Sequence, residues 1–314
     1  MPIRVVFMGT AELACASLRA LLQSAQFSLQ AVVTQPDRPK GRALKPQPSP
    51  VHQVGAQAAL PILQPEKARD PAFLHRLAEF NPEVIVVAAY GQILPQSILD
   101  LPKFGCVNVH TSLLPKYRGA APIQWAILNN DQETGVTIMK MSAGLDTGAI
   151  LSQRTIPIEP SETAAGLHDR LAVLGAELLV ETLPRFIAGE ISAKPQDEAL
   201  ATYARKITKE DGHLDWSLPA LALRNKVRAF TPWPGAYTFW PEVGANRLLK
   251  IWRAEIEPRS GTPGHLLEAG RSKMTIACGT DALRVEELQL QGGRRMNTAE
   301  FLAGHSLPPD SSFK

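Results

Sequence analysis

Three polar side chains near the middle of the sequence have the chemistry needed to move an acyl group. Asn108 and His110 stand two residues apart at the end of a short apolar run, and Asp146 follows in the segment Gly-Leu-Asp-Thr-Gly. An amide can donate to a developing oxyanion, an imidazole can exchange a proton near neutral pH, and a carboxylate can orient that imidazole. None of the three is a strong nucleophile. The residues therefore indicate direct transfer of a group between two bound substrates.

Short apolar runs flank these residues and predict the strands that position them. Val107 and Val109 alternate with the polar residues, and residues 136–141 are largely apolar. The polar groups are expected to emerge where these strands stop. Taken singly, Asn108 could be a turn former, His110 a satisfied loop histidine and Asp146 a turn residue. Only the combination favours catalysis.

The first half of the chain alternates between strand and helix patterns. Strands are expected at residues 3–8, 29–33, 84–88, 105–108, 136–141 and 150–155, with apolar helical stretches at 72–80 and 123–128. This alternation predicts an α/β domain with a doubly wound, Rossmann-like parallel sheet whose ligand binds at the carboxyl ends of the strands. The turn after the first strand lacks the Gly-x-Gly-x-x-Gly pattern of a dinucleotide site. A leucine-rich helix is expected from about Ser161 to Gly189.

The pattern changes after this long helix. Residues 190–209 are mixed and polar and are predicted to be a linker, which gives a first domain at residues 1–189 and a second at 210–314. In the second domain a helix is expected at 218–230 and short strands at 248–254, 274–277 and 282–290, with a capping box from Asn297 to Glu300. Several short strands in about 100 residues predict a small β fold, and the pattern does not separate one such fold from another.

Longer motifs around the three polar residues resemble the 10-formyltetrahydrofolate-dependent formyltransferases. They are Asn-Val-His-Thr-Ser-Leu-Leu-Pro at 108–115, Lys-Tyr-Arg-Gly-Ala-Ala-Pro-Ile-Gln-Trp at 116–125 and the segment around Asp146. The segments at 34–42, 206–212 and 228–236 narrow the resemblance to members that act on methionine carried by initiator tRNA. The resemblance runs from Arg4 to about His305.

The resemblance implies a reaction, its substrates and the shape of the second domain. The formyl donor would be 10-formyltetrahydrofolate, and the acceptor the α-amine of methionyl initiator tRNA in translation initiation. Asn108, His110 and Asp146 would be catalytic, and the second domain would be an OB-like β-barrel that binds tRNA. The folate-binding segment would be Ser112, Leu113, Leu114 and Pro115.

A loop at residues 36–50 contains five prolines and four basic residues. Loops of this length within compact domains are usually functional or disordered, so a solvated, mobile loop is the alternative. The clustered positive charge and the resemblance favour contact with the acceptor end of tRNA, with Arg42 foremost. The other basic residues of the loop are Arg38, Lys40 and Lys45.

Composition indicates the cellular compartment and the kind of partner. Net charge is +3, and the part from Arg205 onward has 16 basic against 12 acidic residues, which agrees with a polyanionic partner. Three widely spaced cysteines and a start without a signal-peptide layout predict a cytoplasmic protein. The histidines and cysteines show no metal-ligand spacing, so no metal is expected. Nothing indicates an obligate protein partner, and a monomer is expected.

Two other kinds of function remain open at this level. A related formyltransferase or hydrolase could use the same folate chemistry with a small acceptor such as an amino sugar or glycinamide ribonucleotide, although such an acceptor needs neither the loop nor the basic second domain. A non-catalytic RNA-binding module could retain the barrel beside a degenerate α/β domain. The intact Asn108, His110 and Asp146 argue against that second alternative.

Overall fold

The computed structural model describes residues 1–40, 45–242, 245–269, 273–305, 307 and 311–314. Two compact units account for the described chain. The first comprises residues 1–122, 133–157 and 168–204, and the second comprises residues 123–132, 158–167 and 205–314. The fold is a mixed, mostly parallel α/β domain followed by an antiparallel, curled half-barrel, as the sequence predicts.

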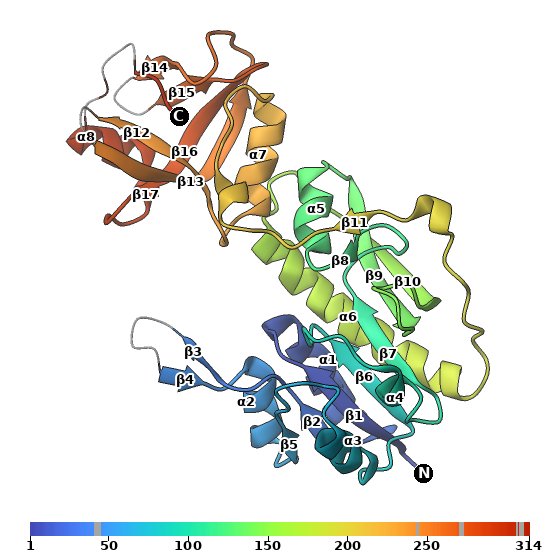
Figure 1. The fold of residues 1–314 in the computed structure, drawn as a ribbon. Helices are drawn as coiled ribbons and strands as arrows, with labels where there is room; N and C mark the ends of the chain where they lie inside the picture. The colour runs from blue at the N-terminus through green and yellow to red at the C-terminus, as the bar shows by residue number, and fades with distance from the viewer. Residues whose placement is uncertain (41–44, 243–244, 270–272, 306, 308–310) are drawn as a thin grey trace. The chain divides into compact units, whose positions relative to one another are not determined.

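The first unit is built on a sheet whose strands are mostly parallel (Figure 1). Its order is β10 (Ala149–Pro157), β9 (Glu133–Lys140), β7 (Cys106–His110), β6 (Val84–Ala88), β1 (Ile3–Gly9), β2 (Phe27–Val33) and β5 (Ile62–Leu63). The five strands from β7 to β5 run parallel, whereas β9 pairs with both β7 and β10 in the antiparallel sense. The expected parallel sheet is therefore confirmed for these five strands and is mixed at the β9–β10 edge.

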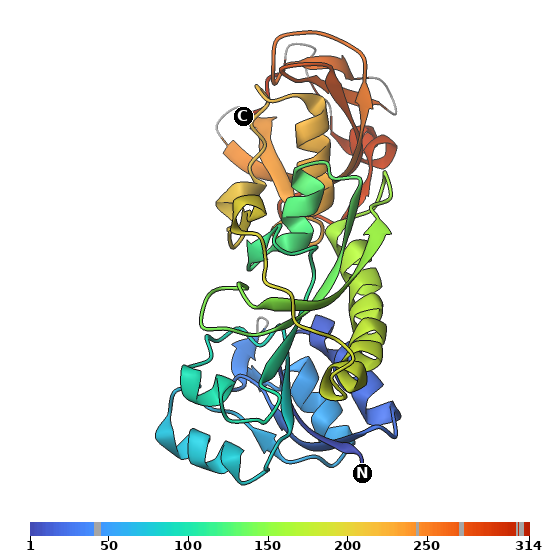
Figure 2. The same ribbon diagram turned by 90° about the vertical axis from the view of Figure 1, so that its right-hand side faces the viewer.

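Helices cover both faces of this sheet. Helices α3 (Pro71–Ala78) and α4 (Gln96–Leu99) contribute Phe73, Leu77 and Ile98 to a buried cluster that includes Cys106 of β7. Helix α1 (Glu12–Gln23) packs beside α2 (Pro50–Gln57), and α2 contacts β2. Helix α6 (Ala164–Ile187) runs alongside β7 in both views (Figures 1 and 2).

The α6 helix lies close to one face of β7. A Cβ added at Gly175 of α6 would come within 2.8 Å of Val109 Cγ1, so a glycine is needed at this crossing. Successive side chains of a strand point to opposite faces. Val109 therefore faces α6, while Cys106, Asn108 and His110 share the other face.

The second unit is an antiparallel sheet with two helices. Its strands are β12 (Ala236–Glu242), β13 (Ala245–Glu257), β16 (Ala282–Leu290), β15 (Met274–Ala277) and β14 (Leu266–Ala269), in that order, and β17 (Met296–Asn297) pairs with β16. Helix α7 (Ala220–Ala229) packs on β13, and α8 (Thr298–Gly304) begins at Asn297, whose side chain accepts from the Glu300 N–H. Of the predicted capping box, the structure shows the N-cap bond at Asn297.

Two earlier segments of the chain, residues 123–132 and 158–167, also belong to this unit. Helix α5 (Pro122–Leu128) leads into one of them, where Asn130 accepts a hydrogen bond of 3.3 Å from Asn225. In the other, the Glu162 carbonyl accepts from Arg228 at 2.9 Å. Both bonds anchor α7 to chain that lies before it in the sequence.

Residues 196–204, within the expected linker, are structured and pack on the first unit. They contain the 3₁₀ turn η1 (Glu198–Leu200) and strand β11 (Tyr203–Ala204), which pairs in parallel with β8 (Arg118–Gly119). The Ala204 carbonyl also accepts the N–H of Ala120 at 2.9 Å. The chain then continues through the 3₁₀ turn η2 (Glu210–Gly212).

Candidate active site

Asn108 and His110 lie in the last three residues of β7, which extends two residues past the end expected from the sequence, so that His110 also belongs to the strand. Asn108 is in register with Val87 of β6 and Met139 of β9, so it lies between two strands in the interior of the sheet. The two residues are 9% and 6% exposed, respectively. Because they are two positions apart on one strand, their side chains leave the sheet on the same face.

The Asn108 carboxamide is available to a ligand. It makes no side-chain hydrogen bond within the described part of the chain, and it is not among the fully buried atoms there that lack partners. A carboxamide with free N–H donors at the end of a strand can donate to a negatively charged oxygen. The strand holds these donors in a fixed place before any substrate binds.

His110 is held by a main-chain carbonyl. Its Nε2 lies 3.0 Å from the carbonyl oxygen of Tyr117. Because a carbonyl oxygen can only accept, Nε2 carries the proton of this bond. The other ring nitrogen, Nδ1, lies 3.7 Å from Oδ2 of Asp146. Nδ1, which faces the Asp146 carboxylate, is therefore the ring nitrogen that can exchange a proton with a substrate.

Asp146 is fixed by the segment that also holds His110. The backbone N–H of Gly119 donates to Oδ2 of Asp146 at 2.8 Å, and Asp146 has a backbone φ of 51°. Gly119 itself has φ 114°, and a Cβ there would lie 2.8 Å from the Ala204 carbonyl oxygen, so this position requires glycine. Residues 117–119 therefore hold both members of the His110–Asp146 pair.

The path of the chain to Asp146 differs from the one expected. From the sequence, the polar groups are expected where the strands stop, at one edge of the sheet. Strand β9 is antiparallel to β7, and its last residue, Lys140, is in register with Val107. The following residues 141–148 therefore have to return toward His110, and the bond from Gly119 marks where they arrive.

The predicted folate-binding segment is tied into the sheet beside these residues. Ser112 Oγ donates to the Lys116 carbonyl at 2.6 Å, and the Ser112 carbonyl accepts from Thr137 Oγ1. The Leu114 N–H donates to the same Thr137 hydroxyl at 3.1 Å. Gln153 donates to the Leu114 carbonyl at 2.8 Å. These polar groups are hydrogen-bonded within the protein, so the segment is held rigidly.

Of the other predicted folate-binding residues, Leu114 is buried and Leu113 is partly buried. Pro115 is joined to Leu114 by a cis peptide bond, and its carbonyl accepts the N–H of Thr202 at 3.2 Å. Large apolar side chains are exposed on two other loops. Ile93, which follows β6, is 85% exposed, and Leu145, next to Asp146, is 59% exposed.

The basic loop at residues 36–50 contains a hairpin that extends away from the sheet (Figure 1). Strand β3 (Arg38–Lys40) pairs with β4 (Lys45–Gln47), with Lys40 in register with Lys45. The Arg38 side chain is exposed. Arg42, the residue foremost in the tRNA prediction, lies outside the described residues, as do the side chains of Lys40 and Lys45.

Cys106 lies two residues from Asn108 but has a structural role. Its side chain is buried, and Sγ lies 3.5 Å from the Ile98 carbonyl oxygen. Burial raises the pKa of the Cys106 thiol to about 12, with Asp100 adding to the effect. A thiol with this pKa is not a nucleophile near neutral pH. Cys106 is therefore a small buried residue of a strand.

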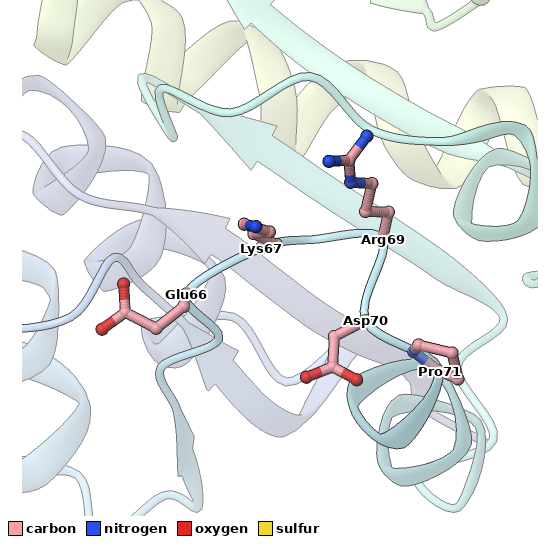
Figure 3. A pocket seen from close by; sticks show the side chains of 5 residues that line it. All are labelled: Glu66, Lys67, Arg69, Asp70 and Pro71. Atoms are coloured by element: carbon pink, nitrogen blue, oxygen red, sulfur yellow. The ribbon is translucent and has the colours of Figure 1, made fainter.

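The described residues also form a surface pocket near the start of α3. Figure 3 shows a surface pocket lined by Glu66, Lys67, Arg69, Asp70 and Pro71, which come from one segment before and at the start of α3. Within the described ranges, no three His, Cys, Asp or Glu side chains gather in a way that could hold a metal ion. No helix in this part of the chain is both long and apolar enough to cross a bilayer.

Two family models match most of the chain. The model described as formyl transferase matches residues 3–183, and the formyl transferase C-terminal domain matches residues 206–306. Methionyl-tRNA formyltransferase of Citrifermentans bemidjiense is 51% identical over 98% of this chain and 95% of its own. The same enzyme of Caldanaerobacter subterraneus subsp. tengcongensis is 49% identical over 99% of this chain and 100% of its own.

Solved structures with low sequence identity share the fold. The sugar 3N-formyltransferase WlaRD, solved with dTDP and 5-N-formyl-THF, matches with a TM-score of 0.65 at 20% identity, over 94% of this chain and 100% of its own. HypX from Aquifex aeolicus, solved with tetrahydrofolic acid, matches with a TM-score of 0.64 at 18% identity, over 96% of this chain and 47% of its own.

Proposed function

This chain belongs to the methionyl-tRNA formyltransferase family, and we propose that Asn108, His110 and Asp146 are the residues with which it transfers the formyl group. The reaction moves a formyl group from 10-formyltetrahydrofolate to the α-amine of methionyl initiator tRNA. The observation that carries the proposal is the shared support of His110 and Asp146 by residues 117–119, beside an Asn108 carboxamide with free donors.

The arrangement gives each side chain a distinct role. As the amine adds to the formyl carbon, negative charge develops on the formyl oxygen, and the Asn108 N–H donors stabilise it. His110 adds a second donor when Nδ1 is protonated. Asp146, whose Oδ2 lies 3.7 Å from that nitrogen, orients the ring.

A proton must also leave the amine, because only a neutral amine can attack and the final amide nitrogen carries one hydrogen fewer. Asp146 and Nδ1 of His110 lie together and share this role as base, while the proton passes on to N10 of the departing folate. Since Nε2 is engaged by the Tyr117 carbonyl, the transfer uses the Nδ1 side of the ring. Beyond this proton transfer, the enzyme speeds the reaction mainly by holding the two substrates in one orientation.

The residues near the site fit a folate. A flat pterin ring needs apolar walls, and Ile93 and Leu145 are exposed on the loops that follow β6 and β9, the two strands beside β7. We propose that residues 87–93 and 112–115 hold the folate. The second of these acts mainly as the rigid support, because the Ser112 hydroxyl and the Leu114 N–H are already bonded within the protein.

The acceptor stem of the tRNA is proposed to lie along the β3–β4 hairpin. Its basic residues can contact phosphates, while the chain from Arg205 onward supplies an excess of positive charge for the tRNA body. We accordingly propose a catalytic domain at residues 1–189 and a tRNA-binding domain at 210–314. We also propose that residues 190–209 join them, that the enzyme works as a monomer, and that it acts in the cytoplasm, where translation begins.

Replacing Arg42 with alanine is expected to weaken productive binding of charged tRNA with little change in folate affinity. If Arg42 contacts one phosphate, the slope of log affinity against log salt should fall by roughly one unit. Filter binding at several salt concentrations measures this slope. Arg19→Ala, at an exposed basic position on α1, is the matched control. An unchanged slope and a normal rate for Arg42→Ala would show that the loop does not touch tRNA.

The function itself is tested by incubating the protein with 10-formyltetrahydrofolate and either charged initiator tRNA or small amine acceptors. Formylmethionyl-tRNA should form, and amino sugars and glycinamide ribonucleotide should remain unmodified. Formyl transfer to a small amine at a comparable rate would support the small-acceptor alternative. Release of free formate without an acceptor would indicate a hydrolase.

A further inference from the structure

The carboxamide of Gln196 uses every hydrogen-bonding position it has. Its Nε2 donates to the carbonyl oxygens of Asp146 and Gly148, both at 2.7 Å. Its Oε1 accepts from Nε and Nη2 of Arg118, at 3.0 and 2.8 Å. A carboxamide has two N–H donors and one oxygen with two lone pairs, so Gln196 is saturated. Among side chains of this length, only glutamine can give and accept in this way.

The Arg118 side chain completes the arrangement. It is fully buried, and its Nη1 and Nη2 donate to the two carboxylate oxygens of Glu198, each at 2.8 Å. A buried guanidinium needs such partners, and these leave it unable to move without breaking several charge-assisted bonds. Gln196 and Glu198 therefore anchor residues 196–198 to a fixed point within the first unit.

The bonds form a closed circuit around Asp146. Gly119, the residue after Arg118, donates its N–H to the Asp146 carboxylate, while the Arg118 side chain reaches the Asp146 carbonyl through Gln196. Arg118 and Gly119 thus fix both the carboxylate and the backbone of Asp146. Asp146 has φ 51°, in the left-handed region, which aspartate tolerates better than most residues but which is less stable than the common backbone conformations.

We propose that Gln196 is a positioning residue that sets the place of the Asp146 carboxylate relative to His110. The inference rests on the proposed role of Asp146 in formyl transfer. Without the two bonds from Gln196, the backbone of residues 146–148 loses a fixed support, and the 3.7 Å relation between Asp146 Oδ2 and His110 Nδ1 is no longer maintained. Residues of the expected linker are in this way part of the catalytic machinery.

Two substitutions separate this role from simple anchoring of Arg118. Gln196→Glu keeps the length of the side chain and can still accept from Arg118, but it cannot donate to the carbonyls of Asp146 and Gly148. Gln196→Met keeps the approximate shape and makes neither set of bonds. Gln96→Ala is the matched control, because Gln96 makes an exposed bond of 2.8 Å to Asp100 on α4.

Gln196→Glu should lower kcat by about 10–100-fold, as for the loss of a side chain that orients a metal ligand through a hydrogen bond. KM for both substrates should change by less than about threefold, because neither substrate is proposed to touch Gln196. Gln196→Glu should also lower the thermal unfolding temperature, because a carboxylate oxygen then faces the carbonyls of Asp146 and Gly148, and Gln196→Met should lower both activity and stability. Near-normal kcat in Gln196→Glu would overturn the proposal, because anchoring of Arg118 would then be the only role.

Combining the changes with Asp146→Asn separates failure of this inference from failure of the proposed function. In the Asp146→Asn background, Gln196→Glu should cost less than about threefold, because the carboxylate it positions is already absent. An equal loss in both backgrounds would show that Gln196 acts independently of Asp146. A near-normal rate for Asp146→Asn alone would instead overturn the proposed role of Asp146, and this inference with it.

Discussion

Replacing Asn108 with alanine is expected to lower the rate of formyl transfer by about 10²–10³-fold, as for loss of one donor to an oxyanion. Folate binding should be largely unchanged, since the carboxamide is proposed to act on charge that develops during the reaction. Asn108 makes no side-chain bond to other described residues, so its removal should leave the fold intact. Single-turnover transfer to charged tRNA, with both substrates saturating, measures the effect.

Asn129→Ala, at an exposed position after α5, is the control for loss of a carboxamide. It should transfer formyl at the parent rate. A rate within a few-fold of the parent for Asn108→Ala would remove Asn108 from the mechanism. A large rise in KM for the folate with unchanged kcat would make it a ground-state binding residue instead.

Asp146→Asn is expected to lower the transfer rate by about 10²–10⁴-fold, the range of general acid–base contributions. The substituted side chain keeps the shape, and its amide oxygen can still accept the Gly119 N–H that Asp146 accepts at 2.8 Å. The negative charge beside Nδ1 of His110 is lost, and with it the carboxylate that shares the role of base. Transfer rates across a range of pH measure the effect.

The control is Asp100→Asn, at a carboxylate that accepts an exposed bond from Gln96. It should behave as the parent does. If Asp146→Asn kept full activity with only a shifted pH optimum, Asp146 would tune the site without being required for transfer.

The sequence was informative where side-chain pattern and chemistry coincide. Val107 and Val109 predict the β7 strand, and in the structure Asn108 and His110 share one face of it. The strand was expected to end at residue 108, whereas it extends to His110. The pattern underestimates its length because His110, although polar, is satisfied in the interior by the Tyr117 carbonyl.

The pattern of apolar residues does not give the direction of a strand. An apolar run at residues 136–141 has the same appearance in a parallel and an antiparallel strand, because side chains alternate identically in both. The antiparallel pairing of β9 with β7 therefore could not be predicted, nor could the return of residues 141–148 to the site. The resemblance placed Asp146 there without showing the path.

The supports of the site were the hardest part to predict. His110 and Asp146 are held by the carbonyl of Tyr117 and the N–H of Gly119, which every residue has and no sequence pattern marks. Gln196 lies in a polar stretch whose composition predicts a linker. One signal was present: Arg118 stands between apolar and small residues, and a buried arginine requires acceptors from elsewhere in the chain.

The double variant Asn108→Ala/Asp146→Asn provides the most direct measurement of whether these residues act as one catalytic unit. Groups that act together in one transition state are strongly non-additive, so the double variant should transfer formyl within about tenfold of the slower single variant. Single-turnover rates of the parent, both single variants and the double variant, measured on one preparation of charged initiator tRNA, give the comparison. A double variant slowed by the full product of the two single effects would show that the residues act independently and would contradict the account.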